Sequence, residues 1–292
     1  MANFVGNIFY FQQMKLKVSI SPCPNDTFMF EAWINQRIQY PQHLHFDFHF
    51  ADIKTLNQWA LNSETDITKI SVFTAGQVLN HYELLTVGSA LGYKNGPLII
   101  SKKKIYPDEI PYVKIGVPGF NTTANLLLQL FYRPQQATKE YFFNEIEEAL
   151  LENEIDAGVI IHETRFTYQR KGLQKIADLG EQWEASYHLP LPLGAIAIKR
   201  NLPRDIKKAI NHILYQSITF AFQNPDASMS IIKAHAQETA ENVIKQHIDL
   251  YVNEFSLNIG TKGKEAIAKL LSEGIQLHLL PSNPLNVFID EE

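Results

Sequence analysis

The sequence predicts an α/β fold whose sheets are largely parallel. From Lys15 onward, short runs with strand character alternate with segments in which apolar residues recur at helical spacing. This alternation is typical of βαβ units. Hydrophobic residues make up 45% of the 292 residues and charged residues 20%, which suits a globular protein of two modest domains.

Eight strands are expected from short apolar or alternating runs bounded by polar residues, glycine or proline. In chain order they are Leu16 to Ser21, His45 to Ala51, Asp66 to Ile70, Leu84 to Val87, Leu98 to Ser101, Lys114 to Val117, Ile155 to Ile161 and Gly194 to Lys199. Helices are expected at residues 74–80, at residues 125–132 and from Pro203 to about Gln276, because apolar residues there follow helical spacing.

Two proline-containing stretches interrupt this pattern. Lys102 to Pro111 follows one strand, and Leu189 to Gly194 precedes another. If both are crossings between domains, residues 103–195 form a smaller inserted α/β domain, and residues 1–102 and 196–292 form a larger discontinuous one. A cleft would then lie between the two domains.

Composition excludes several classes of partner and site. The net charge of −5 without a basic cluster argues against nucleic acid, and the single Cys23 excludes an intramolecular disulfide. No apolar stretch approaches the ~20 residues that span a bilayer, and residues 1–13 lack the features of a secretory signal. We therefore expect a cytoplasmic protein. The sequence leaves open whether residues 1–13 belong to the native protein, and what the oligomeric state is.

Polar residues follow two of the predicted strands, at the edge where open α/β sheets bind ligands. Residues 21–28 (SPCPNDTF) form a loop stiffened by two prolines, and Asn25 or Asp26 is the expected N-cap of the next helix. Residues 68–71 (TKIS) end in Ser71, which is expected to cap a helix. Each segment is either only a turn and a cap, or also part of the wall of a ligand cleft.

A third junction suits an anion. Residues 116–124 (GVPGFNTTA) lead from a strand into a helix, and the hydroxyls of Thr122 and Thr123 lie where the first free N–H groups point. A substrate carboxylate fits such a place, although Asn121 or Thr122 also suits simple N-capping. The glycines match no dinucleotide or P-loop fingerprint, so we expect no nucleotide cofactor.

Other histidines and the cysteine have simpler explanations. Along one predicted strand face the polar residues are His43, His45, Asp47 and His49. Neighbouring ligands on such a face are ~7 Å apart, too far for three of them to reach one zinc ion at ~2 Å. A solvated strand face explains them better, and we expect no metal. His247 shares a helix face with apolar residues and is expected in the core, and Cys23 has no evident base to activate it.

His162 differs in its placement. It follows the buried run Gly158 to Ile161 directly, so it is expected at the mouth of a strand beside the cleft. Histidine is the side chain best suited to proton transfer near neutral pH. This position makes His162 a candidate base.

Several of these motifs together identify a family. The chain resembles the 1,4-dihydroxy-6-naphthoate synthases, the cyclic dehypoxanthine futalosine lyases of the futalosine route to menaquinone. The matching stretches are SPCPNDTF (21–28), TLNQWA (55–60), TKIS (68–71), GVIIHETRF (158–166), LPLPLGAI (189–196) and NEFSL (253–257).

The resemblance implies a periplasmic-binding-protein-like fold, with two α/β domains joined by two hinge strands and a substrate in the interdomain cleft. It also implies a carbon–carbon lyase without cofactor or metal, acting on a small carboxylate. In this family His162 would be the general base, Thr122 and Thr123 would hold the carboxylate, and residues 69–71 (Lys69, Ile70 and Ser71) would line the substrate. The family often has histidine where this chain has Asn121, so Asn121 is given no catalytic role.

Two alternatives stay open. Chorismate dehydratase acts in the same pathway on a similar scaffold, but the His162 motif and the SPCPNDTF loop favour the lyase. A non-catalytic cytosolic binding protein or sensor is the alternative from another class, because this fold mostly binds small solutes.

Overall fold

The structure is a computed structural model that describes residues 13–236, 240–282 and 285–290, and it contains two β-sheets. In spatial order the first sheet consists of β2 (Leu44–Phe50), β1 (Met14–Ile20), β3 (Ile67–Ser71), β11 (Leu191–Lys199) and β4 (Tyr82–Leu84), with β5 (Ala90–Gly92) also paired to β11. The second consists of β10 (Gln174–Asp178), β6 (Leu98–Ser101), β9 (Ala157–Ile160), β7 (Ile115–Val117) and β8 (Lys139–Glu140). Residues 1–12, part of the N-terminal segment 1–13 considered above, lie outside the described residues.

Both sheets are mixed, so the expectation of largely parallel sheets is wrong. β1 runs parallel to β2 and β3, and β7 runs parallel to β8 and β9. β11 is antiparallel to its neighbours, and so is β6. The reason is topological. β6 and β11 are the strands that the chain enters immediately after crossing from one sheet to the other, so they run away from the side at which β1, β3 and β9 end.

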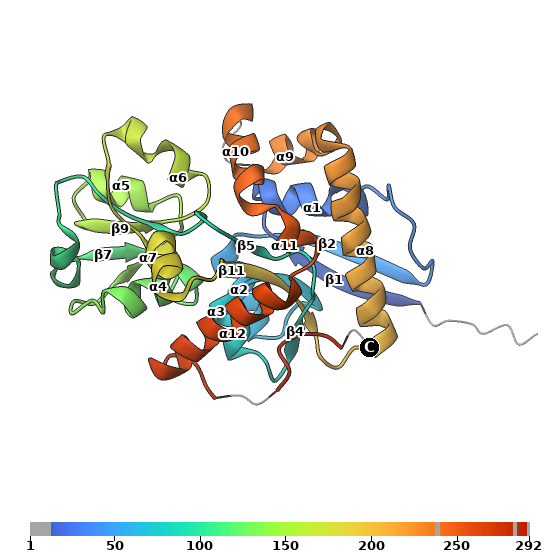
Figure 1. The fold of residues 1–292 in the computed structure, drawn as a ribbon. Helices are drawn as coiled ribbons and strands as arrows, with labels where there is room; N and C mark the ends of the chain where they lie inside the picture. Colours follow the sequence, from blue (N-terminus) through green and yellow to red (C-terminus); the bar gives the residue numbers. More distant parts are fainter. Residues whose placement is uncertain (1–12, 237–239, 283–284, 291–292) are drawn as a thin grey trace, which may run out of the picture.

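Helices surround both sheets (Figure 1). Those that follow strands of the first sheet or end the chain are α1 (Pro24–Ile34), α2 (Ile53–Leu61), α3 (Val72–Gln77), α8 (Arg204–Gln223), α9 (Met229–His235), α10 (Glu241–Tyr251), α11 (Glu254–Leu257) and α12 (Gly260–Gln276). Those of the second sheet are α4 (Thr123–Phe131), α5 (Ile146–Leu151), α6 (Thr164–Thr167) and α7 (Leu179–Tyr187). Short 3-10 helices occupy Pro107–Tyr112, Tyr168–Lys171 and Pro225–Ser228. No helix in the described part of the chain is both long enough and apolar enough to cross a membrane.

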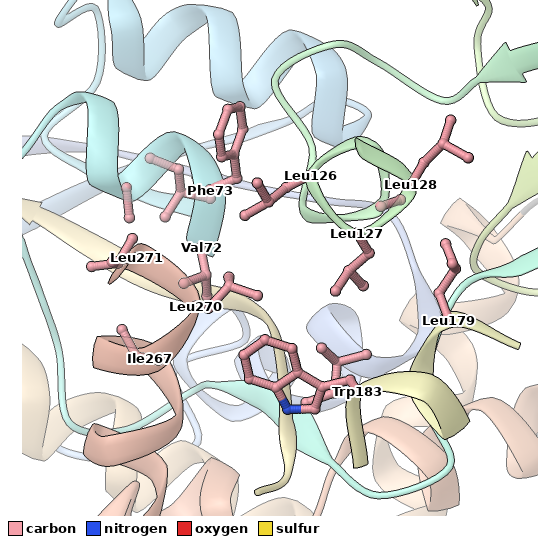
Figure 2. Close-up of a cluster of buried hydrophobic side chains, with 14 of the residues drawn as sticks. Val72, Phe73, Leu126, Leu127, Leu128, Leu179, Trp183, Ile267, Leu270 and Leu271 are labelled. Carbon is pink, nitrogen blue, oxygen red and sulfur yellow. The ribbon is translucent and has the colours of Figure 1, made fainter. Parts of the chain in front are cut away.

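One hydrophobic cluster joins the two sheets (Figure 2). It brings α3 and α12, which cover the first sheet, against α4 and α7, which cover the second. The labelled side chains are Val72, Phe73, Leu126, Leu127, Leu128, Leu179, Trp183, Ile267, Leu270 and Leu271. The two halves of the molecule therefore share apolar packing as well as two chain crossings.

The crossings lie a few residues from where the sequence suggested. The chain leaves the first sheet after β5 and enters the second at β6, so the first crossing segment is residues 93–97 and not the stretch from Lys102 to Pro111. Leu98–Ser101 pairs in the second sheet, although the expected boundaries leave it in the larger domain. The chain returns through residues 188–190. The division into domains 1–102 with 196–292 and 103–195 stays a prediction.

Smaller differences concern strand and helix ends. The strand expected at Leu84 to Val87 overlaps β4 only at Leu84, because β4 begins earlier, at Tyr82, and ends at Leu84. β5, β8 and β10 were not expected. They are short or polar, and they form because neighbouring strands supply pairing partners.

Candidate functional site

A cavity of about 80 Å³ lies where β1, β3 and β9 end and the crossing strands begin. Both halves of the molecule line it. Of the residues singled out from the sequence, the cavity wall contains Asn25, Asp26, Lys69, Ser71, Thr122, Thr123 and His162. Ile70 is missing from the wall and packs in the hydrophobic core instead. Successive side chains of a strand point to opposite faces, so Lys69 and Ser71 face the cavity while Ile70 faces away.

The SPCPNDTF loop supplies a buried carboxylate. Asp26 Oδ2 accepts a 2.6 Å hydrogen bond from Ser21 Oγ, and Asp26 Oδ1 accepts from Asn25 Nδ2 at 2.8 Å and from Lys69 Nζ at 2.7 Å. The side chains of Lys69 and Asp26 are only 6% and 1% exposed. Neither Asn25 nor Asp26 is the N-cap of α1, because the helix already begins at Pro24 and its N-cap is Cys23. Their side chains are thereby free to form this network at the cavity.

Ser71 does occupy the N-cap position of α3, but its side chain caps nothing. Its Oγ accepts a hydrogen bond of 2.9 Å from Asn57 Nδ2, and the Ser71 N–H donates to Asn57 Oδ1, also at 2.9 Å. Asn57 Nδ2 also reaches the carbonyl of Asn121. Asn57 therefore links the end of β3 to the segment that leads into α4.

The two threonines at the start of α4 are buried and already hydrogen-bonded. Thr122 caps the helix by accepting from the N–H of Asn125 at 3.2 Å, and its hydroxyl donates to Gly119 O. Thr123 Oγ1 donates to Leu193 O at 2.9 Å and accepts from the N–H of Phe73. The first N–H groups of a helix have no carbonyl one turn back, so this helix start still offers backbone donors to an anion.

His162 lies at the mouth of β9 with left-handed backbone (φ 58°), a conformation that histidine adopts more readily than most residues. Its Nδ1 is 3.4 Å from Cys23 Sγ, and its Nε2 is buried without a hydrogen-bond partner. Its ring packs edge-to-face with the ring of Phe143, with centroids 4.7 Å apart. Although part of the residue reaches the surface, burial of the ring lowers its pKa from 6.5 to about 4. The ring is therefore uncharged at neutral pH, with one nitrogen directed to Cys23 and the other without a partner.

This pKa predicts a titration. The His162 ring should titrate with a midpoint near pH 4 in an NMR experiment. Because the unfolded ring takes up its proton near 6.5 and the folded ring only near 4, the unfolded chain binds more protons between these values, and stability should fall as the pH is lowered through this window. Urea titrations at several pH values would measure it, and His162→Asn should make the dependence shallower. An equal pH dependence in that variant would contradict the assignment.

Cys23 was expected to have no base beside it, but its Sγ lies next to His162 Nδ1. The histidine nevertheless does not activate the thiol. Burial, reinforced by the charges of Glu163 and Asp26, raises the pKa of the Cys23 thiol well above 9.0. The thiol therefore stays protonated and is a poor nucleophile.

Cys23, His162 and Glu163 also bring one potential metal ligand each to within 4.8 Å of one another, the one such group in the described ranges. Burial raises the pKa of the Cys23 thiol, so a metal ion would have to displace its proton to bind the thiolate. The histidines of β2 form no such group among the described residues, and the side chains of Asp47 and His49 there are 44% and 40% exposed. The structure thus gives the expected solvated strand face.

The sequence misplaced His247. It is buried as expected, but it lines the cavity, and its Nε2 is 2.9 Å from Asn25 Oδ1. Tyr251, one turn further along α10, also lines the cavity. His247 would have the same helical spacing to its apolar neighbours whether it faced the core or the cavity. The local sequence therefore does not distinguish the two placements. The nearest sequence signal for a role of this region in the site was the family motif NEFSL, which begins two residues after α10 ends.

Comparison with known proteins gives one family. The menaquinone biosynthesis family matches residues 16–275. The chain is 38% identical over 274 residues to the 1,4-dihydroxy-6-naphthoate synthase of Thermus thermophilus, covering 94% of this chain and 99% of that protein. It is also 38% identical over 272 residues to the enzyme of the same name from Streptomyces coelicolor, covering 91% and 95%.

Solved structures show the same fold. A protein from Archaeoglobus fulgidus superposes with a TM-score of 0.86 at 32% identity, covering 91% of this chain and 98% of that one. The alkanesulfonate-binding protein of Xanthomonas axonopodis pv. citri, bound to MOPS, gives a TM-score of 0.67 at 12% identity, covering 93% and 96%. The fold is thus that of the periplasmic binding proteins, as the sequence predicted.

Proposed function

The chain belongs to the menaquinone biosynthesis family and has a role in that pathway, and on this premise we propose that it is a 1,4-dihydroxy-6-naphthoate synthase working as a carbon–carbon lyase. The proposed substrate is cyclic dehypoxanthine futalosine, a carboxylate with a spiro-fused sugar ring. One observation carries the proposal. An uncharged histidine with an unpartnered Nε2 lies in the same cavity as a helix start that suits a carboxylate.

In the proposed reaction the sugar ring opens and the carbon–carbon bond to the naphthalene-forming part then breaks. His162 Nε2 removes a proton from a hydroxyl of the sugar part, and the O–H electron pair becomes part of a new carbonyl. The electron pair of the broken carbon–carbon bond moves into the other part, which becomes aromatic and takes up a proton on an oxygen. Electrons and protons balance without a redox step. A positioned base typically contributes ~10²- to 10⁴-fold to such a reaction.

The contact with Cys23 is compatible with the form of His162 that the reaction requires. If Nδ1 carries the proton and points it at the uncharged Sγ, 3.4 Å away, Nε2 keeps its lone pair for the substrate. The low pKa of His162 keeps this lone pair available at neutral pH. The carboxylate would bind at the start of α4, through backbone N–H groups and the hydroxyls of Thr122 and Thr123, which would turn their protons from Gly119 O and Leu193 O to the carboxylate.

The direct test is product formation. Purified protein incubated with cyclic dehypoxanthine futalosine should yield 1,4-dihydroxy-6-naphthoate, detected by its absorbance and mass. Binding of the substrate without product would refute the lyase and favour a binding protein. Conversion of chorismate instead would identify the dehydratase. A cytoplasmic location stays a prediction.

Changes at the threonine pair should affect binding more than turnover. Replacing Thr122 and Thr123 by alanine removes the cap of α4, which costs about 1 kcal/mol, and loosens the carboxylate site. We expect KM to rise at least tenfold with a smaller change in kcat. Thr122→Ser with Thr123→Ser keeps both hydroxyls and should stay near wild type. A KM unchanged in the alanine variant would exclude this helix start as the carboxylate site.

A further inference from the structure

His247 is hydrogen-bonded at one ring nitrogen and has no hydrogen-bond partner at the other. Its Nε2 is 2.9 Å from Asn25 Oδ1, while its Nδ1 is buried without a hydrogen-bond partner. The residue is wholly buried, lines the cavity and comes from α10, far from His162 in the sequence.

The neighbouring charges fix which nitrogen of His247 carries the proton. Asn25 Nδ2 donates to Asp26 Oδ1, and Asp26 is itself held by Lys69. If the amide were turned over, its oxygen would face the Asp26 carboxylate, so Oδ1 must face His247. An amide oxygen only accepts. His247 Nε2 therefore carries the proton, and Nδ1 has a free lone pair.

The two cavity histidines are arranged alike. The rings of His162 and His247 are parallel within 5°, with centroids 6.3 Å apart. Each has one nitrogen facing a protein atom and one without a partner. Burial lowers the pKa of both, which keeps both uncharged. Leaving a buried acceptor unpaired destabilises a protein, so a ligand donor at Nδ1 would relieve that cost.

We propose that His247 is a second substrate-contacting residue whose Nδ1 takes the hydroxyl proton that starts sugar-ring opening, while His162 serves carbon–carbon cleavage. This inference rests on the proposed lyase function, which requires both steps. Each step begins with a proton leaving a sugar hydroxyl, and the cavity offers two proton acceptors.

The ring-opening step needs no outside reactant. His247 Nδ1 takes the proton of the hydroxyl on the hemiacetal carbon of the sugar ring, and the O–H electron pair forms a carbonyl there. The bond between that carbon and the ring oxygen breaks, and its pair goes to the ring oxygen. That oxygen takes the proton back from Nδ1. His247 ends the step uncharged, and the opened sugar is ready for cleavage at His162.

His247→Gln tests the assignment, because the glutamine amide can still donate to Asn25 as Nε2 does but offers no acceptor at the Nδ1 position. We expect kcat to fall at least 100-fold, with the bound substrate remaining ring-closed, so that its ¹³C NMR spectrum shows a hemiacetal carbon and no carbonyl carbon in its place. His162→Asn should instead accumulate the ring-opened compound, whose carbonyl carbon the same spectrum shows. The exposed His212 carries the matched control His212→Gln, which should turn over like the wild type.

The outcomes separate the two proposals. If the wild type makes no product, the lyase function fails. If the wild type is active and folded His247→Gln turns over at a similar rate, only the role of His247 is overturned. A second measurement does not depend on that variant folding. In His162→Asn protein mixed with cyclic dehypoxanthine futalosine, the ¹⁵N resonance of His247 Nδ1 should move as it accepts a hydrogen bond, and an unmoved resonance would refute the contact.

Discussion

His162→Ala is expected to lower kcat about 10²- to 10⁴-fold while KM changes only a few-fold, because the imidazole acts on the reacting hydroxyl and the carboxylate is held elsewhere. Losses of this kind appear in kcat and kcat/KM together. Steady-state kinetics with cyclic dehypoxanthine futalosine would measure both constants. Added imidazole should restore part of the rate in the alanine variant, since the lost ring leaves space beside Cys23 and Phe143.

A backbone effect has to be separated from this chemical one. His162 has left-handed backbone, in which alanine is strained and asparagine is not. His162→Asn should therefore keep more stability than His162→Ala and be equally impaired in turnover. Near-normal turnover in either variant would refute His162 as the base. If activity followed stability across the two variants, its role would be structural.

Lys69→Met should destabilise the protein by about 3–5 kcal/mol, because it leaves the Asp26 carboxylate buried without its cation. The pair is only 2.7 Å apart, and both side chains are almost wholly enclosed. Asp26 keeps Ser21 and Asn25 as donors, but neutral donors do not replace a charge. The free energy of unfolding from urea titration would give the magnitude.

A double variant distinguishes the charge from the packing. Lys69→Met with Asp26→Asn removes both charges and should recover much of the lost stability. The exposed pair Lys139–Glu154 provides a matched control, and Lys139→Met should change stability little, because water screens it. If Lys69→Met were as mild as Lys139→Met, Asp26 would not depend on that cation. Turnover should fall as well, since Asp26 also orients Asn25 and hence His247.

Strand ends were the part of the site that the sequence could predict. β1, β3 and β9 are short buried strands that are followed by polar residues, and Asp26, Ser71 and His162 all line the cavity. β1 and β3 are parallel neighbours whose ends meet at one edge of the first sheet, and β9 ends at the cavity from the second sheet. Thr122 likewise caps α4, as its residue type suggests.

Contacts between distant segments were not predictable. His247 reaches Asn25 across 222 residues of sequence, and its helical spacing is the same whether it contacts core or cavity. The direction of β11 depends on where the chain crosses between sheets, which no local pattern encodes. The prediction that Ile70 lines the substrate was wrong for a simpler reason. It took the family motif as a continuous stretch, whereas successive side chains of β3 point to opposite faces.

The small size of the cavity has a consequence for the timing of catalysis. The cavity measures about 80 Å³, whereas a substrate with two fused rings and a sugar needs a pocket of at least about 300 Å³. On the proposed function the two halves of the molecule would therefore move apart to admit the substrate, and the apolar contact of α3 and α12 with α4 and α7 (Figure 2) would resist that motion. If this opening limits turnover, kcat will fall as the viscosity of the solvent is raised.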